Sequence, residues 1–240
     1  GVSRASFVLS TKKSTWQDGP ELRATALGPA LDASLKRLRL DHVDVYHLHG
    51  LSAALYDRAC AEWAPELQRL KRAGKIRWIG VTEAFESDRG HAMLSRAVAD
   101  GWPDVVMAGF NILNPSARER VFAPAAGKGI ATLVMFAVRK AFSRPQRLAE
   151  ILADLRTRGK LGAGLDEGPD PLGFLTREGG ASSPADAAYR FCRHEPGVHV
   201  VQFGTGDAGH LADNLRSLQA PPLPAAVLAR LRSAFGRVDD

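Results

Sequence analysis

Short β-rich runs alternate with longer amphipathic runs along most of the chain, and this alternation limits the possible folds more than any other feature. The predicted strands cover residues 6–12, 43–49, 75–82, 104–111, 129–136 and 198–205. The predicted helices cover residues 21–40, 56–74, 88–100, 115–128, 145–158 and 207–218. Such a series of about six β-then-α units calls for a parallel sheet with right-handed crossovers, because each helix carries the chain back to the start of the next strand.

Both a doubly wound sheet and a β/α barrel fit this alternation. A dinucleotide-binding doubly wound fold carries GxGxxG after an early strand, and none of the predicted turns has this pattern. Polar residues do end several strands, at Lys12, His49, Thr82 and Asn111. Since barrel enzymes place their chemistry at the C-terminal ends of strands, we expect residues 1–240 to form a single α/β domain of the parallel TIM-barrel type.

The composition disfavours several other classes of protein. The chain is 45% hydrophobic and 24% charged, which suits a globular domain with a sizeable core. Its net charge is +6, but basic residues are scattered among acidic ones, so nucleic-acid binding is not expected. Cys60 and Cys192 lack metal-ligand spacing, so no metal is expected either. The most apolar run is far shorter than the roughly 20 residues of a membrane-spanning helix, and we expect a cytoplasmic protein without membrane contact.

Residues 158–183 form one long irregular stretch that is rich in glycine and proline. Irregular stretches of this length in compact domains are commonly functional lids or disordered segments. A solvated connection between two elements fits the sequence equally well.

Five segments resemble, in order and spacing, segments of the aldo-keto reductases, which are nicotinamide-dependent (β/α)8-barrel enzymes. The segments are FVLSTKK, SLKRLRLDHVDVYHLHG, LKRAGKIRWIGVTEAF, VVMAGFNILN and VVQFGTGDAGHLADNL. By this resemblance Lys12 and His49 match the lysine and histidine of the family's Asp-Tyr-Lys-His tetrad. The family's Asp and Tyr would lie before residue 1. We therefore expect an incomplete barrel of about six β/α units with two exposed edges, and an isolated chain that is inactive.

The resemblance also implies a nicotinamide cofactor, either NADP or NAD. The turn at residues 204–206 would let backbone amides approach a phosphate, and the following helix would offer its N-terminus to an anion. In the family this region holds the adenosine end of the cofactor, whereas the ends of two earlier strands hold the nicotinamide. The implied positions are Gly204, Thr205, Gly206, His210 and Asn214 for the adenosine end and Thr82, Glu83 and Met107 for the nicotinamide end.

Strand parity separates neighbouring polar residues, because alternate side chains point to opposite faces. Lys12 and Lys13 therefore point in opposite directions, and only one of them can enter the barrel. His47 and His49 share a face, with His49 at the strand end and His47 one layer deeper. We expect His49 to orient the substrate carbonyl and His47 to be a hydrogen-bonded interior residue. Tyr46 lies on the opposite face and is a poor replacement for the family's tyrosine.

The expected function is NAD(P)-dependent interconversion of small-molecule carbonyls, including sugar-like substrates, and alcohols. In the family the tyrosine is the proton donor, the lysine lowers its pKa, and the histidine orients the carbonyl. Because half of the tetrad is not represented, an alternative is a catalytically inactive nucleotide-binding regulatory or interaction protein of the same fold.

Overall fold

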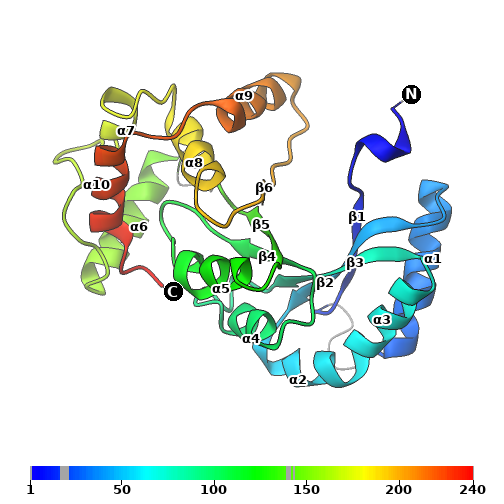
Figure 1. The fold of residues 1–240 in the computed structure, drawn as a ribbon. Coiled ribbons are helices and arrows are strands. Elements are labelled where there is room, and N and C mark those ends of the chain that lie inside the picture. Colours follow the sequence, from blue (N-terminus) through cyan, green and yellow to red (C-terminus); the bar gives the residue numbers. More distant parts are fainter. Residues whose placement is uncertain (1, 17–21, 139–141, 143, 240) are drawn as a thin grey trace. The chain divides into compact units, whose positions relative to one another are not determined.

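The computed structural model describes residues 2–16, 22–138, 142 and 144–239, and within them the predicted alternation of strands and helices is confirmed (Figure 1). The strands are β1 Ser10–Ser14, β2 Val43–Leu51, β3 Ile76–Glu83, β4 Val105–Gly109, β5 Ala131–Met135 and β6 Val200–Val201. The helices are α1 Leu27–Leu38, α2 Tyr56–Arg58, α3 Ala64–Arg72, α4 Ala92–Asp100, α5 Ala123–Ala126, α6 Pro145–Thr157, α7 Phe174–Arg177, α8 Pro184–Arg193, α9 Ala208–Gln219 and α10 Ala225–Phe235. Glu21, where the first predicted helix begins, lies outside the described residues.

The chain forms two compact units. The first comprises Gly1–Ala108 and Pro124–Ala131, and the second comprises Gly109–Ala123 and Thr132–Asp240. The first unit contains β1 to β3 and nearly all of β4, and the second contains nearly all of β5 and the whole of β6. The assignment of residues 1–240 to one domain stays a prediction.

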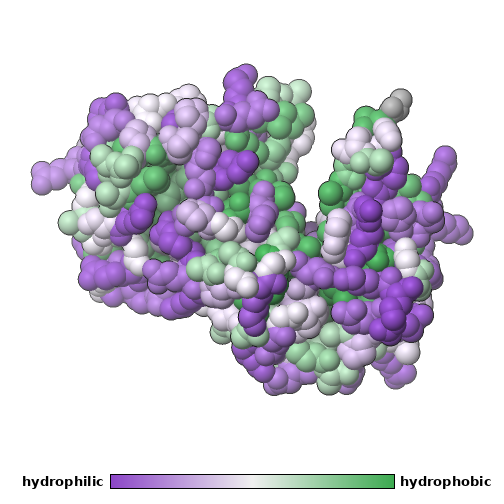
Figure 2. Space-filling view, in the orientation of Figure 1, coloured by the Kyte–Doolittle hydropathy of each residue, from purple (hydrophilic) through white to green (hydrophobic). Residues whose placement is uncertain are grey.

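In the first unit, β1 to β4 pair in sequential order and every pair is parallel. Strand β2 is buried along almost its whole length, because β1 and β3 flank it and α1 and α3 lie alongside these strands (Figure 1). Tyr46 of β2 donates a hydrogen bond from its hydroxyl to the carbonyl of Leu27 in α1, which confirms that it faces the helices. Figure 2 shows mainly hydrophilic side chains over the outer side of α1, consistent with a helix that buries one face only.

The beginning of β1 differs from the sequence prediction. Residues Arg4–Ser6 form a 3-10 turn, and pairing of β1 with β2 begins only at Leu9 and Ser10. The buried carboxylate of Asp44 accepts hydrogen bonds from the amide of Leu9 at 2.8 Å and from the guanidinium of Arg4 at 2.6 Å. Burial alone would raise the pKa of Asp44, but these bonds and one from Arg77 outweigh it and lower the pKa to about 2. Phe7 and Val8, which precede the Leu9 amide bound by Asp44, remain exposed.

Two predicted helices contain a widened π turn, and each of these turns lies just before a proline. The run from α2 to α3 has its π turn at Ala59–Trp63, before Pro65, and the run that ends in α5 has one at Arg118–Phe122, before Pro124. Proline has no amide hydrogen and cannot donate the usual bond to the carbonyl four residues earlier. The helices continue past both prolines by widening one turn.

The second unit contains the parallel pair β5–β6, with Leu133 opposite Val200. Its core includes a stack of Phe110 and Phe191 with ring centroids 5.3 Å apart. The guanidinium of Arg118 lies over both rings and makes a two-point ion pair with the carboxylate of Glu195. Helix α10 also belongs to this unit and was not foreseen from the sequence.

The irregular stretch at residues 158–183 is docked onto α10 and includes the short helix α7. The amide of Gly162 donates to the carbonyl of Ala234 at 2.8 Å, and Arg230 donates to the carbonyl of Gly164 at 3.0 Å. A Cβ atom on Gly162 would lie only 2.0 Å from the carbonyl oxygen of Ser233. Glycine is therefore required for this close approach, and the geometry favours a docked segment over a solvated connection.

Candidate active site

Lys12, His49 and Thr82, predicted at the ends of the first three strands, lie on successive strands of the first unit, whereas Asn111, predicted at the end of the fourth, lies in the second unit. Strand pairing places Lys12 opposite His47, Ser14 opposite His49, and Thr82 opposite Met107. Lys12 is exposed, and its positive charge lowers the pKa of both His47 and His49. The structure therefore brings Lys12 and His49 together on the same part of the sheet, as parity predicted.

His49 is half-buried near the C-terminal end of β2. Burial lowers the pKa of its imidazole, and the charge of Lys12 lowers it further. The backbone carbonyl of His49 accepts hydrogen bonds from the amide of Thr15 at 2.9 Å and from the hydroxyl of Thr15 at 3.0 Å. These bonds hold the ends of β1 and β2 together. Near neutral pH the imidazole is uncharged and can donate one hydrogen bond to a carbonyl oxygen.

His47 occupies the deeper layer as predicted, but the expectation that it would be hydrogen-bonded is wrong for the described residues. His47 is 1% exposed, and neither of its ring nitrogens has a hydrogen-bond partner among the described residues. The ring lies over Gly80 of β3, where an added Cβ atom would be 2.2 Å from the His47 Nδ1 atom. Because glycine offers no side chain, the imidazole fills the space beside the strand without finding a polar partner.

We expect the pH dependence of stability to report on His47. Burial, together with the nearby charges of Lys12 and His49, lowers its pKa to about 4. The unfolded chain would bind a proton on this residue near its usual pKa of about 6.5, so the folded state loses stability as the pH falls from about 6.5 towards 4. At pH ~4.5 the loss should be about 2–3 kcal/mol.

The measurement is urea unfolding of wild-type protein and His47→Leu at neutral pH and near pH ~4.5. Leucine has no group to protonate and leaves no unpaired ring nitrogen, so the variant should keep its stability at neutral pH and lose this part of the pH dependence. The same acid-induced loss in both proteins would contradict the assignment.

The predicted nicotinamide-side residues are buried in the first unit. The hydroxyl of Thr82 accepts a hydrogen bond from the amide of Gly50 at 2.8 Å. The carboxylate oxygens of Glu83 lie 3.0 and 2.9 Å from the Nδ1 atom of His91, and both side chains are fully buried. His91 adopts a left-handed backbone with φ of 59° at the start of α4 and stacks on Phe85. Glu83 therefore holds the loop after β3 against the end of its strand.

His91 was not among the residues predicted from the sequence. It lies eight positions after Glu83, and its only local signal is a histidine that follows a glycine before an amphipathic run. Such a pattern does not indicate a partner across a loop. The pair becomes visible only when the loop is folded.

Neither tyrosine of the first unit is placed to act as a proton donor beside Lys12. Tyr46 faces α1, and Tyr56 donates to the carboxylate of Asp100 at 2.7 Å. Burial raises the pKa of both phenols far above their usual value. Tyr189 is buried on α8 of the second unit and packs edge-on against Phe203.

The predicted adenosine-side residues all lie in the second unit. The residues from Gly204 to His210 are exposed, and an added Cβ atom at Gly204 or Gly206 would meet no atom within 4 Å. Asp207 caps α9 by accepting a hydrogen bond from the amide of His210 at 2.8 Å. The half-buried Asn214 lies one turn further along α9. The glycine turn leaves open space before α9, and contact of these residues with a dinucleotide stays a prediction.

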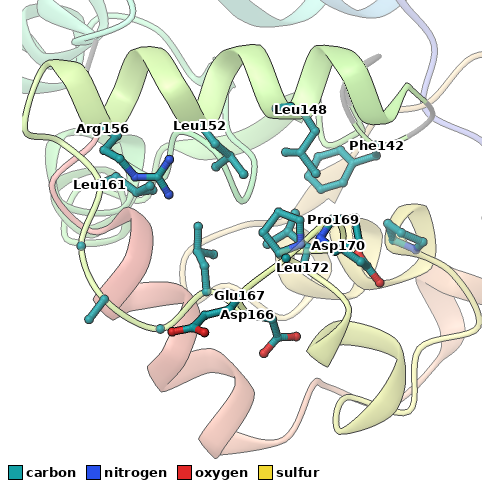
Figure 3. A pocket seen from close by; sticks show the side chains of 18 residues that line it. Phe142, Leu148, Leu152, Arg156, Leu161, Asp166, Glu167, Pro169, Asp170 and Leu172 are labelled. Carbon is teal, nitrogen blue, oxygen red and sulfur yellow. The ribbon is translucent and has the colours of Figure 1, made fainter.

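A cavity of about 720 Å³ lies in the second unit between α6 and the docked segment (Figure 3). Leu148 and Leu152 project into it from α6, facing Leu172, while Asp166 and Glu167 lie at its edge. The carboxylate of Asp166 is already bound by arginines, including Arg230 at 2.6 Å. None of the described residues that line this cavity belongs to the predicted site.

Two kinds of feature are absent from the described residues. No group of three or more His, Cys, Asp or Glu side chains lies close enough to hold a metal ion in the part of the chain that the structure describes. Among the same residues, no helix combines the length and the apolar character that a transmembrane span needs.

The model of the Aldo/keto reductase family matches residues 1–235, and the chain belongs to this family. It is similar to L-galactose dehydrogenase of Arabidopsis thaliana, with 37% identity over 81 residues, which are 34% of this chain and 25% of the plant protein.

Two solved aldo-keto reductases share the fold. The holo form of a Bacillus halodurans aldo-keto reductase has a TM-score of 0.67 and 22% identity, and the match covers 95% of this chain and 72% of that one. A Klebsiella pneumoniae aldo/keto reductase, solved with NADP and acetate, has a TM-score of 0.63 and 20% identity, with 95% and 70% of the chains covered. The fold is therefore of the (β/α)8-barrel type, and the described residues contain six of its strands.

Proposed function

We propose that the chain is part of an NAD(P)-dependent oxidoreductase that interconverts carbonyls and alcohols by hydride transfer. The observation that carries this proposal is the pairing of β1 with β2, which sets the Lys12 ammonium near the uncharged imidazole of His49 at the C-terminal side of a parallel sheet. Membership of the Aldo/keto reductase family supports it. The similarity to a protein named L-galactose dehydrogenase supports a sugar-like substrate.

The two groups have complementary tasks in this reaction. The His49 imidazole donates a hydrogen bond to the substrate oxygen and so orients the carbonyl. The Lys12 ammonium stabilises negative charge nearby, both on that oxygen and on a phenol that gives it a proton. The nicotinamide cofactor, when bound, supplies or accepts the hydride.

We propose that the cofactor is held in two places. Gly204, Thr205 and Gly206 would contact its phosphates through backbone amides, with His210 and Asn214 beside the adenosine. Thr82 and Met107 would lie near the nicotinamide. Contact of Glu83 with the nicotinamide stays a prediction. The Glu83 carboxylate is buried against His91 and would have to turn away from it to reach a ligand.

Asn214→Ala tests the adenosine end. We expect the variant to bind dinucleotide more weakly by about 1–3 kcal/mol, because a ligand polar group would lose its hydrogen-bond partner. Titrations of reduced NAD and NADP fluorescence give the affinities and the cofactor preference together. Gln219→Ala, at the exposed end of the same helix, is the matched control and should bind normally. Equal affinities of wild-type protein and Asn214→Ala would remove Asn214 from the site.

The inactive nucleotide-binding protein remains the second candidate function. It is favoured by one observation, namely that the phenols of Tyr46 and Tyr56 are buried away from the Lys12 side of the sheet. This candidate predicts dinucleotide binding without turnover.

A further inference from the structure

The cavity between α6 and the docked segment has walls that are held in place by hydrogen bonds. The carbonyl of Leu161 accepts a hydrogen bond from Arg237 at 3.0 Å, and the carboxylate of Asp166 accepts one from the amide of Phe174 at 3.0 Å. Between these points, the amide of Asp166 donates to the carbonyl of Pro171 at 3.0 Å and closes a tight loop. The volume of about 720 Å³ lies within the range of small-molecule sites, about 300–1,000 Å³.

Much of the lining is apolar. Leu148 and Leu152 of α6 face Leu172 and Pro169 of the docked segment (Figure 3). Leu152 and Leu172 are buried, whereas Leu148 is half-buried and its side chain is open to a ligand. Burial of apolar surface here would therefore favour a ligand with an apolar body.

Four charged side chains line the same cavity, and two of them are already used by the protein. The carboxylate of Asp166 is bound by Arg177 and by Arg230, the latter at 2.6 Å. The carboxylate of Asp170 lies 3.9 Å from the guanidinium of Arg177. These two acids belong to the ion-pair network that docks the segment onto α10.

The other two charges are Arg156 and Glu167. Elsewhere on α6, Arg158 pairs with Asp154 at 2.9 Å. The side chains of Arg156 and Glu167 make no hydrogen bond or ion pair with any residue in the described part of the chain. Figure 3 shows them on opposite walls, with Arg156 on α6 and Glu167 on the docked segment. The cavity thus offers one unpaired cation and one unpaired anion across an apolar space.

We propose that this cavity binds a small apolar zwitterion of dipeptide size. Its carboxylate pairs with Arg156, its ammonium group pairs with Glu167, and its side chains lie against Leu148 and Leu172. An apolar anion would leave Glu167 unpaired, and an apolar cation would leave Arg156 unpaired. A single amino acid carries both charges but fills less of the cavity. The site is separate from the residues of the proposed function and does not depend on it.

The test follows leucine methyl signals in two-dimensional proton–carbon NMR spectra of the chain. The probe is L-leucyl-L-leucine, which should shift the signals of Leu148 and Leu152 in a saturable way. The signals of Leu67, buried on α3 of the first unit, should not move. Three related compounds are compared with the probe, namely its N-acetyl derivative without the ammonium group, its C-terminal amide without the carboxylate, and free leucine. Each should bind about two- to fivefold more weakly, the scale of one exposed ion pair.

Two variants connect each charge of the ligand to its partner. Arg156→Gln should weaken binding of the dipeptide by the same factor and should bind the amide as wild-type protein does. Glu167→Gln should behave in the same way towards the N-acetyl derivative. Arg158→Gln and Asp154→Asn, which change charges of α6 outside the cavity, are the matched controls and should bind the dipeptide normally.

Filling the cavity provides an independent check. Ala149 and Ala163 line it from opposite walls and are exposed, so Ala149→Trp or Ala163→Trp should block the dipeptide and leave thermal unfolding close to normal. A lack of saturable shifts with the dipeptide would overturn the inference. Equal affinities for the dipeptide, its N-acetyl derivative and its amide would do so too, as would unchanged binding by Arg156→Gln and Glu167→Gln. All titrations are made without dinucleotide, so their outcome is independent of the Asn214→Ala experiment.

Discussion

The 240-residue chain alone is expected to reduce carbonyls at least about a hundredfold more slowly than the same chain extended upstream by β/α units that carry an aspartate and a tyrosine. General acid catalysis contributes about 10²–10⁴-fold, and the chain offers Lys12 no suitable phenol in its own unit. Tyr46 bonds to α1 and Tyr56 bonds to Asp100, both with raised pKa values that make them poor proton donors.

The measurement is oxidation of reduced NAD and NADP in the presence of an aldehyde, with dinucleotide binding measured in parallel. His49→Ala in the extended protein is the control, because it should remove most of the restored turnover while leaving cofactor affinity close to normal. Rapid turnover by the 240 residues alone would show that another residue is the acid. Binding without turnover in both proteins would favour the regulatory candidate.

Replacement of His91 by leucine is expected to destabilise the protein by about 1–3 kcal/mol, the usual cost of removing a hydrogen-bond donor from a buried polar group. Both carboxylate oxygens of Glu83 are within 3.0 Å of the His91 Nδ1 atom, and neither side chain reaches solvent. Leucine has similar bulk but cannot donate a hydrogen bond, so the carboxylate would lose this donor.

His91→Asn is the matched variant. The asparagine side-chain nitrogen is attached at the same position as Nδ1, and asparagine tolerates the left-handed backbone of residue 91 better than most residues. It should retain more than half of the stability that leucine loses. The double variant Glu83→Gln, His91→Leu replaces the buried carboxyl group with a neutral amide and should also be more stable than His91→Leu. Urea unfolding compares the four proteins, and equal losses for leucine and asparagine would contradict a hydrogen-bonding role for His91.

Much of the first unit was predictable because its strands are regular and buried. The apolar alternation located β2 and β3 to within two residues at each end, and parity placed Tyr46 towards the helices and Lys12 with the histidines. These predictions depend only on the two-residue period of a strand, which any buried sheet must obey. The start of β1 was misplaced because it depends on Asp44, a partner that is distant in the sequence.

The remaining features of the site depend on contacts that local patterns do not encode. Nothing in the sequence indicates that the His47 imidazole lacks a hydrogen-bond partner among the described residues, because its environment is set by a glycine on another strand. The pairing of Glu83 with His91 requires a loop to fold back on itself.

The composition of the two compact units has a practical consequence for anyone who divides the gene. The two units alternate along the sequence. Residues 109–123 of the second unit lie between the two segments of the first, and residues 124–131 of the first unit lie between the two segments of the second. A single cut anywhere along the chain therefore divides at least one unit between the two fragments. Split-protein reporters and domain exchanges with related sequences would need either two junctions or a rearranged order of segments, and a protease nick within residues 109–131 would affect both halves together.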